Sequence, residues 1–312
     1  MDIKKTSKYY FEILSETFDS FMSDKGLKLS AALAYYTIFS LAPMMIVLIS
    51  IGGIFYGQDA LQGKVFSQIN DLIGSEAALQ IQDILKKLAL SGKGTVAAVL
   101  GVITLIIGAS GIFIEIQDSI NMIWRVRAVP KKGWLKLIIN RVLSLSMIAS
   151  LGFILIVSLL INSVIAAFSN ILIKFLPDFT LIFIDIINLG ITFVVLMSLF
   201  AVIYKVLPDV EITWKQVKAG AFFTALLFML GKYLIGLYVQ YAAVGDIYGA
   251  AGTTIVIAVW VYYSAAILYF GAEFTWAYAK VRGDLIKPSK HAVALRITET
   301  ELGGAEKIDL HQ

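Results

Sequence analysis

The chain has 312 residues, 59% of them hydrophobic and only 15% charged, and its mean hydropathy is +0.82. These values exclude an ordinary soluble protein and predict an integral membrane protein. Because the sequence has no cysteine and only two histidines, it cannot form disulfides, thiolate metal sites or a cysteine nucleophile. Its net charge of +4 reports first on orientation in the membrane.

Six stretches are long and apolar enough to cross a bilayer, which takes about 20 residues at about 1.5 Å per residue. They are approximately Leu29–Phe55, Thr95–Ile116, Leu137–Phe168, Leu181–Tyr204, Val217–Tyr241 and Thr253–Tyr278. The first of them follows a charged segment and lacks a cleavage context, so we expect a retained span and not a signal peptide. The predicted fold class is all-α, a polytopic membrane protein with six transmembrane helices.

Lysine and arginine concentrate on one side of this six-span arrangement. Five precede the first span, six lie between spans two and three, three lie between spans four and five, and six follow span six. The opposite side carries five. Since cytoplasmic loops are enriched in basic residues, the sequence predicts that both termini face the cytoplasm.

Three further regions accompany the transmembrane domain, which we assign to residues 29–280. Residues 1–28 have apolar side chains at helical spacing with charged side chains on the other side, which predicts an amphipathic helix at the cytoplasmic interface. The apolar positions are Tyr10, Ile13, Leu14, Phe18 and Phe21. Residues 57–94 predict a small extracytoplasmic helical cap, and residues 281–312 a polar cytoplasmic tail that we expect to be mobile.

Four short strings are specific when taken together. They are YYTIFSLAP at Tyr35–Pro43, LPD at Leu207–Asp209, YGAAGT at Tyr248–Thr253 and GAEF at Gly271–Phe274. They resemble the YihY/BrkB family, and the resemblance covers roughly residues 26–280. It implies six spans in the bacterial cytoplasmic (inner) membrane, and transport as the usual suggestion for the activity.

The family's older label, ribonuclease BN, implies tRNA processing. A metal-dependent nuclease needs clustered histidine and aspartate ligands. This sequence has no such cluster, so we expect no nucleic acid partner and no ribonuclease activity.

Charged side chains within a span cost at least about 2.5–3.5 kcal/mol, so they are the candidate functional residues. In span two a side rich in glycine continues to Glu115, Asp118 and Arg125. One interpretation is tight helix packing with a carboxylate–arginine network at the interface. The other is the inner mouth of a substrate pathway.

Span five carries Lys232 well inside its apolar stretch, with Gln240 on the same side, and Asp185 on span four lies at a similar depth. Lys232 either forms a structural ion pair or snorkels to the outer interface, or it binds an anion or takes part in ion coupling.

Span six carries Glu273 at about the depth of Glu115 on span two. Two carboxylates that approach in a poorly solvated cavity can share a proton, as a proton-coupled carrier requires. The alternative is separate contacts with Arg125, Arg127 or Lys280.

Pro43 in span one removes a backbone donor and predicts a kink next to Tyr35 and Tyr36. Gly249 and Gly252 predict a flexible entry to span six. We interpret these positions as hinges of a pathway, although structural prolines are common in membrane helices.

The sequence has no GxGxxG, GxxxxGK, nucleophile elbow or metal-ligand spacing, so it predicts a protein that is not an enzyme and needs no metal or cofactor. The first hypothesis is a transporter or lipid translocator for an anionic or amphipathic solute, with proton coupling as an option. The second is a non-transporting membrane organiser that binds lipid or protein. A distant third is a lipid enzyme that uses Glu115 and Asp118. Membrane lipid is the expected partner. The sequence is also compatible with a homo-oligomer.

Overall fold

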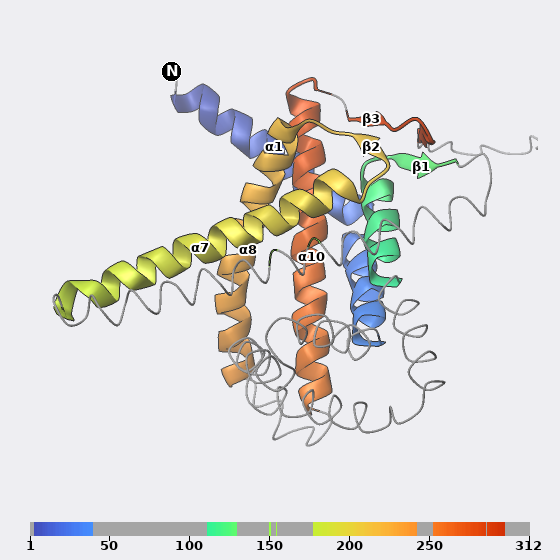
Figure 1. Cartoon of the computed structure of the whole chain (residues 1–312). Helices are drawn as coiled ribbons and strands as arrows, with labels where there is room; N and C mark the ends of the chain where they lie inside the picture. The colour runs from blue at the N-terminus through green and yellow to red at the C-terminus, as the bar shows by residue number, and fades with distance from the viewer. Residues whose placement is uncertain are drawn as a thin grey trace, which may run out of the picture.

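The computed structural model describes residues 3–39, 111–129, 150, 154, 177–241, 252–284 and 286–296. These residues are mostly helical (Figure 1). The long helices are α1 (Ile3–Ser23), α7 (Pro177–Val206), α8 (Trp214–Tyr241) and α10 (Gly252–Val281), and residues 26–39 and 111–123 are also helical. The strands are β1 (Val126–Ala128), β2 (Val210–Glu211), β3 (Lys287–Pro288) and β4 (Ala292–Ala294).

Three of the described helical stretches are long and apolar enough to cross a membrane. They are Ile186–Val206, Trp214–Ile235 and Ile257–Val281, and they coincide with predicted spans four, five and six. Predicted spans one and two are described only at residues 29–39 and 111–116, and the predicted cap at 57–94 lies outside the described residues. The structure therefore agrees with a helical membrane protein.

Helix α10 lies at the centre of the described bundle, between α1 and α8 (Figure 1). Large aromatic side chains from the neighbouring segments are fully buried against it and donate to its backbone. Trp124 Nε1 donates to Ala272 O at 2.9 Å, and the Tyr204 hydroxyl donates to Leu268 O at 2.7 Å. These bonds fix α7 and helix 111–123 in depth relative to α10, because buried polar atoms need their partners.

The contact between α8 and α10 is built from two Gly-x-x-x-Thr pairs that face each other. A Cβ on Gly220 would overlap Thr275 Oγ1, and a Cβ on Gly271 would overlap Thr224 Oγ1. Each threonine hydroxyl donates to the carbonyl of the glycine in its own helix, at 2.7 Å in α8 and 2.8 Å in α10. Small residues permit this close approach of two membrane helices.

Helix α1 packs along α10 through one face and leaves a second apolar face exposed. Ile13 is fully buried against Phe274 and Ala277 of α10. The exposed apolar side chains are Tyr10, Phe11, Leu14, Phe18 and Met22. The apolar positions predicted for one interface are thus divided between a protein contact and an exposed stripe.

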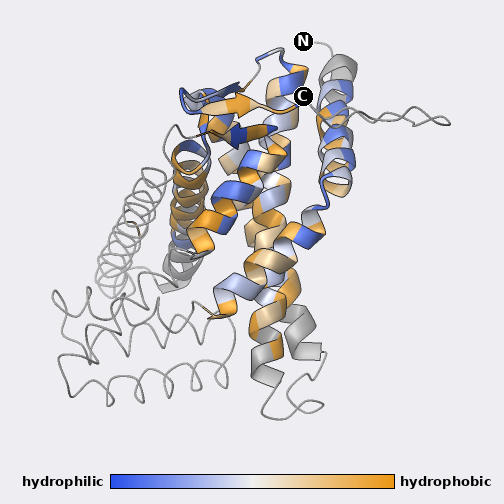
Figure 2. Ribbon diagram, turned by 90° about the vertical axis from the view of Figure 1, so that its right-hand side faces the viewer, coloured by the Kyte–Doolittle hydropathy of each residue, from blue (hydrophilic) through white to orange (hydrophobic). Residues whose placement is uncertain are grey.

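Four strands form two short antiparallel pairs at one end of the bundle, which we call the strand end (Figure 2). Strand β1 pairs with β4, and β2 pairs with β3. The tail was expected to be mobile, but residues 286–296 are fixed here. The reason is backbone pairing, because Leu295 N–H donates to Arg125 O at 2.7 Å and Ser289 N–H donates to Asp209 O at 2.9 Å.

Candidate functional site

The feature that marks a candidate site is the Glu273 side chain on α10. It has no exposed surface, and both of its carboxyl oxygens lack a hydrogen-bond partner among the described residues. The flanking residues Gly271, Ala272 and Ala277 are small, so the neighbouring segments approach α10 closely and seal this carboxyl from solvent. An unpartnered buried carboxyl is unfavourable, which makes the position a functional candidate.

Two turns bring opposite charges to this carboxyl. Asp24 follows the end of α1, and Arg125 follows helix 111–123. Arg125 Nη1 contacts Asp24 Oδ1 at 2.7 Å, with the Asp24 side chain only 7% exposed and that of Arg125 26% exposed. Arg125 and Lys25 have left-handed backbones with φ values of 55° and 56°, so the backbone leaves its helical path at each of these turns. The charged groups that act on Glu273 are, from the strongest, Asp24, Arg125 and Glu16.

A second ion pair lies further along the contact between α1 and α10. Lys280 Nζ contacts Glu16 Oε1 at 2.7 Å, and both side chains are partly exposed. Within the described ranges, no three histidine, cysteine, aspartate or glutamate side chains come together as a metal ion would require. The site that the structure offers is therefore a carboxylate and arginine cluster.

Glu115 is the carboxylate predicted to pair with Glu273. It is half-buried and accepts a hydrogen bond from Ser119 Oγ at 3.4 Å. The Tyr269 hydroxyl, one helical turn before Glu273, lies beside Ser119 and Glu115. The carboxylates that act on Glu273 are Asp24 and Glu16, and the predicted pair of Glu115 and Glu273 stays untested. Asp118 is exposed on the same helix as Glu115 and acts on it electrostatically.

Lys232 is exposed on α8, next to Gly231, which packs closely against Tyr263 of α10. Asp185 belongs to α7 and Gln240 to α8, but their side chains lie outside the described residues. The predicted pair of Lys232 and Asp185 is therefore untested.

Of the predicted aromatic and hinge positions, Tyr35 and Tyr36 are exposed, with their ring centroids 5.8 Å apart. Gly252 is the first residue of α10. Pro43 and Gly249 lie outside the described residues. The predicted hinges at Pro43 and Gly249 therefore stay untested.

One of the strings that first suggested a family, GAEF, contains Glu273, and a model of the family described as virulence factor BrkB matches residues 17–296. The chain belongs to the BrkB family. The match includes Asp24, Arg125 and Glu273, so the whole carboxylate and arginine cluster lies inside the family region.

Relatives of this BrkB-family chain are named UPF0761 membrane proteins. The one from Verminephrobacter eiseniae is 28% identical over 276 residues, which are 86% of this chain and 63% of the relative. The one from Vibrio atlanticus is 31% identical over 254 residues, 78% of this chain and 75% of the relative. The chain spans about three fifths of the length of the first relatives that it matches. No solved structure matches.

One residue of the BrkB-family strings, Asp209, was not among the predicted site residues. Its Oδ2 accepts from Asn121 Nδ2 at 2.8 Å and from Gln117 Nε2 at 3.2 Å, and its N–H donates to Asn121 Oδ1 at 2.8 Å. Ser289 N–H donates to its carbonyl. Asp209 thus joins helix 111–123, the turn between α7 and α8, and the tail. The LPD string was the signal that marked it.

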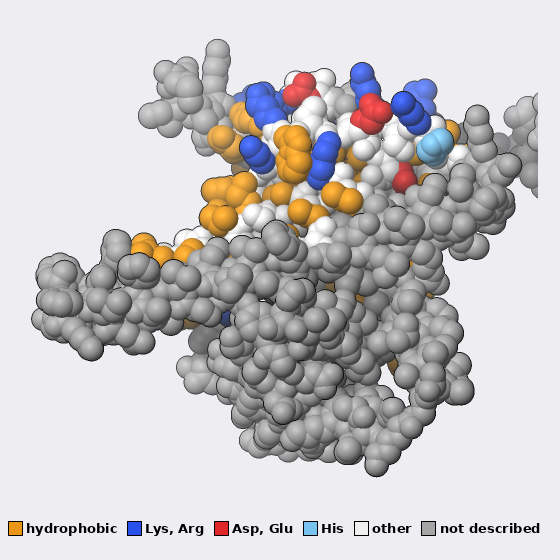
Figure 3. Space-filling model, viewed as in Figure 1, with side chains coloured by type: hydrophobic (Ala, Val, Ile, Leu, Met, Phe, Trp, Pro, Cys, Tyr) orange, Lys and Arg blue, Asp and Glu red, His pale blue; other side chains and the backbone are white. Residues whose placement is uncertain are grey.

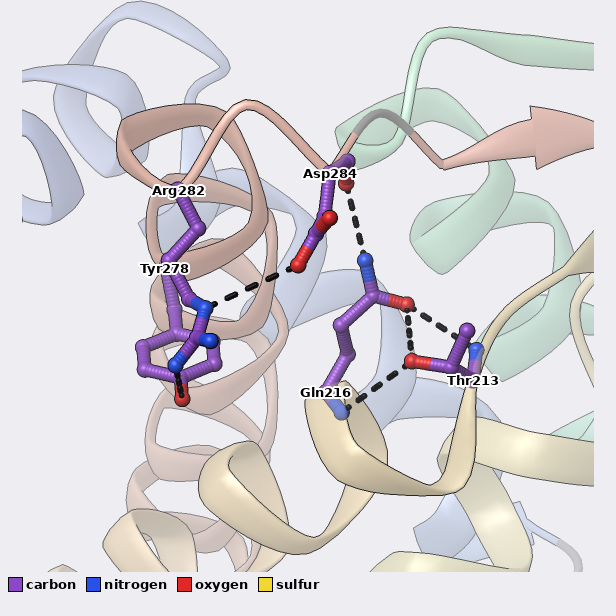
Figure 4. Close-up of polar contacts among 5 residues, drawn as sticks. All are labelled: Thr213, Gln216, Tyr278, Arg282 and Asp284. Carbon is purple, nitrogen blue, oxygen red and sulfur yellow. Dashed lines mark hydrogen bonds and ion pairs between the residues drawn. The ribbon is translucent and has the colours of Figure 1, made fainter.

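A second polar network joins the start of α8 to the segment after α10 (Figure 4). Thr213 caps α8, since its Oγ1 accepts from the Gln216 N–H at 3.5 Å and its own N–H donates to Gln216 Oε1 at 2.9 Å. Gln216 Nε2 donates to Asp284 O at 2.8 Å. Arg282 pairs with Asp284 at 3.6 Å, and its Nη1 donates to the Tyr278 hydroxyl at 2.7 Å, which raises the pKa of Arg282. The Thr-x-x-Gln spacing is a capping box that can be read from sequence.

Proposed function

We propose that the chain is a membrane transporter or lipid translocator that moves an anionic or amphipathic small molecule, with protons coupled through Glu273. The observation that carries this proposal is the complete burial of Glu273 with both oxygens unpartnered among the described residues. Packing alone would favour an apolar side chain there, because an unsatisfied buried carboxyl opposes folding. Ionisable groups at membrane depth are characteristic of ion and substrate pathways.

Lys232 supports the anionic character of the solute. It is exposed on an apolar helix, next to the exposed side chains of Tyr233 and Leu234. A lysine in such surroundings favours an anionic headgroup or solute as its partner. If Asp185 pairs with it instead, the losses in a double-mutant cycle will be non-additive. Additive losses contradict the pair.

We further propose six spans in the bacterial inner membrane with both termini and the strand end in the cytoplasm. Charged side chains gather at the strand end, at the top of Figure 3, and apolar side chains lie below them. Cysteine labelling in intact cells tests this arrangement without background, because the chain has no cysteine. An impermeant reagent should label Ser75→Cys and spare Ser289→Cys. The reverse pattern contradicts the topology.

The transport proposal is tested with purified protein in liposomes. Flux of anionic and amphipathic candidate solutes is measured across imposed pH gradients, for the wild type, Glu273→Gln and the exposed control Glu211→Gln. We expect wild-type flux to depend on pH, Glu273→Gln to flatten that dependence, and the control to behave as the wild type. Protein that binds solutes or lipids but never moves them, over a range of gradients, contradicts transport.

The second candidate function is a non-transporting organiser that binds membrane lipid, and one observation favours it. The apolar stripe of α1, which includes Phe11 and Phe18, is exposed, as in helices that insert into the membrane interface. The organiser model predicts no flux in any variant. It also predicts less co-purified lipid after Phe11→Ser and Phe18→Ser.

We also infer that the chain is not an enzyme. Purified protein should lack intrinsic ribonuclease activity, because its sequence has no cluster of histidine and aspartate ligands for a catalytic metal. Nuclease activity that survives purification and disappears in a designed point variant would contradict this inference.

A further inference from the structure

Three buried oxygen atoms lie where the end of α1 meets α10. They are Asp24 Oδ2 and both carboxyl oxygens of Glu273, and none receives a hydrogen bond from a donor within the described part of the chain. The Asp24 and Glu273 side chains themselves lie within hydrogen-bonding reach of each other. The other oxygen of Asp24, Oδ1, receives the 2.7 Å contact from Arg125. Buried oxygens that lose water without gaining a donor are rare in native proteins. These oxygens are therefore candidates to bind a proton or another cation.

The charges around Glu273 point to the same conclusion. Ionised Asp24 and Glu273 would carry two negative charges, and Arg125 neutralises only one of them. Glu16 also acts on Glu273, but it is paired with Lys280 at 2.7 Å. The second negative charge would therefore be buried without compensation, which protein interiors tolerate poorly.

We propose that Asp24 and Glu273 form a proton-binding site that holds one proton between them. Glu273 carries the proton as a neutral acid, and its O–H donates to Asp24 Oδ2. Arg125 keeps Asp24 in the ionised, accepting form, whereas no ion pair to Glu273 is present among the described residues. One proton thus supplies the missing hydrogen bond and makes the cluster of three side chains neutral.

This site deepens the proposed function by locating the coupling ion, and it rests on that function for the use of the proton. One carboxyl follows α1 and the other belongs to α10, so release of the proton would place two negative charges across this contact. Repulsion between them would weaken the packing of α1 on α10. Proton binding would then favour the closed contact and proton release the open one.

Infrared spectroscopy of the full-length protein in lipid nanodiscs tests the site, because a protonated carboxyl absorbs apart from a carboxylate. We expect an acid band from about one group per chain at pH 7, with a shift to lower frequency in D₂O. Glu273→Gln should remove the band, and the exposed control Glu211→Gln should retain it. In Asp24→Asn the band should shift, because its hydrogen-bond acceptor changes from a carboxylate to an amide.

Wild-type protein alone can overturn the proposal, so the test does not depend on whether a variant folds. Absence of the acid band at pH 7 overturns it, as does a band that Glu273→Gln leaves unchanged. Thermal stability that rises with sodium relative to choline, without an acid band, also overturns it in favour of a metal cation. An acid band in protein that shows no flux supports the proton site and contradicts transport. Flux without an acid band supports transport and contradicts the proton site.

Discussion

Helix α10 makes two contacts of opposite character, one with α8 and one with α1. The contact with α8 is neutral and interlocked, with Gly220 and Gly271 each facing a threonine of the other helix. The contact with α1 combines the apolar packing of Ile13 with charged groups, including Asp24 and Glu273. Both lie within the same few turns of α10, so their difference comes from the side chains and not from depth.

The difference indicates which contact can respond to ions. Packing between glycine and threonine contains no group that titrates near neutral pH, so it stays the same when protons or solutes bind. The contact with α1 depends on the charge state of two carboxyls and one arginine. We therefore expect α8 and α10 to move as one body and α1 to move against them.

The largest effect is expected when the charged contact loses its arginine. Arg125→Gln leaves Asp24 buried without a cation, and the loss of one partner of such a pair should cost about 3 kcal/mol of unfolding free energy. Denaturant titration of the purified protein in detergent measures it. The matched control is Arg127→Gln, two residues along at an exposed position of β1. Equal losses in both variants would show that the ion pair does not stabilise the α1 contact.

One added methyl group should destabilise the neutral contact between α8 and α10. In Gly271→Ala the added Cβ would meet Thr224 Oγ1 and the Tyr204 hydroxyl, and overpacking of this kind costs about 2 kcal/mol. Gly190→Ala on α7 is the control, since a Cβ there would meet no other described group. That variant should be neutral or gain up to about 1 kcal/mol from helix propensity. A neutral Gly271→Ala would contradict the interlocked contact.

The sequence predicted the two spans that form the contact with α8 closely, but not the contact itself. The structure has helices at Trp214–Tyr241 and Gly252–Val281, and the sequence predicted Val217–Tyr241 and Thr253–Tyr278. Long apolar runs define such helices without information from the rest of the chain. Glu273 was also found from sequence, since a carboxylate stands out in an apolar run.

The partner of Glu273 could not be predicted in the same way. Asp24 is followed by Lys25 and Gly26, a composition typical of a solvated turn, and its burial depends on tertiary contacts such as that with Arg125, about 100 residues away in sequence. The strand pairing of residues 287–294 was missed for a related reason. Strands β3 and β4 have two and three residues, too few for a strand pattern, and they are held by backbone bonds to distant segments.

A smaller effect is expected at the cap that joins α8 to the segment after α10. Thr213→Ala removes the hydroxyl of the capping box and should cost about 1 kcal/mol of unfolding free energy. Gln216 should keep its bond to Asp284 O, so the tail should stay in place. Lys215→Ala, an exposed neighbour, is the control and should change little. A loss above that of Gly271→Ala would mean that the cap, and not the helix interlock, fixes α8 on α10.

The smallest effect is expected at the outer ion pair of the α1 contact. The side chains of Lys280 and Glu16 are 55% and 35% exposed, so water and salt screen their attraction, and Lys280→Ala should cost about 0.5 kcal/mol or less. High salt should abolish this loss while leaving the loss in Arg125→Gln largely intact, since that pair is more buried. Unfolding titrations of both variants at low and high salt measure the difference. If both losses respond equally to salt, the charged contact is solvated throughout, and burial would no longer require Asp24 and Glu273 to share a proton.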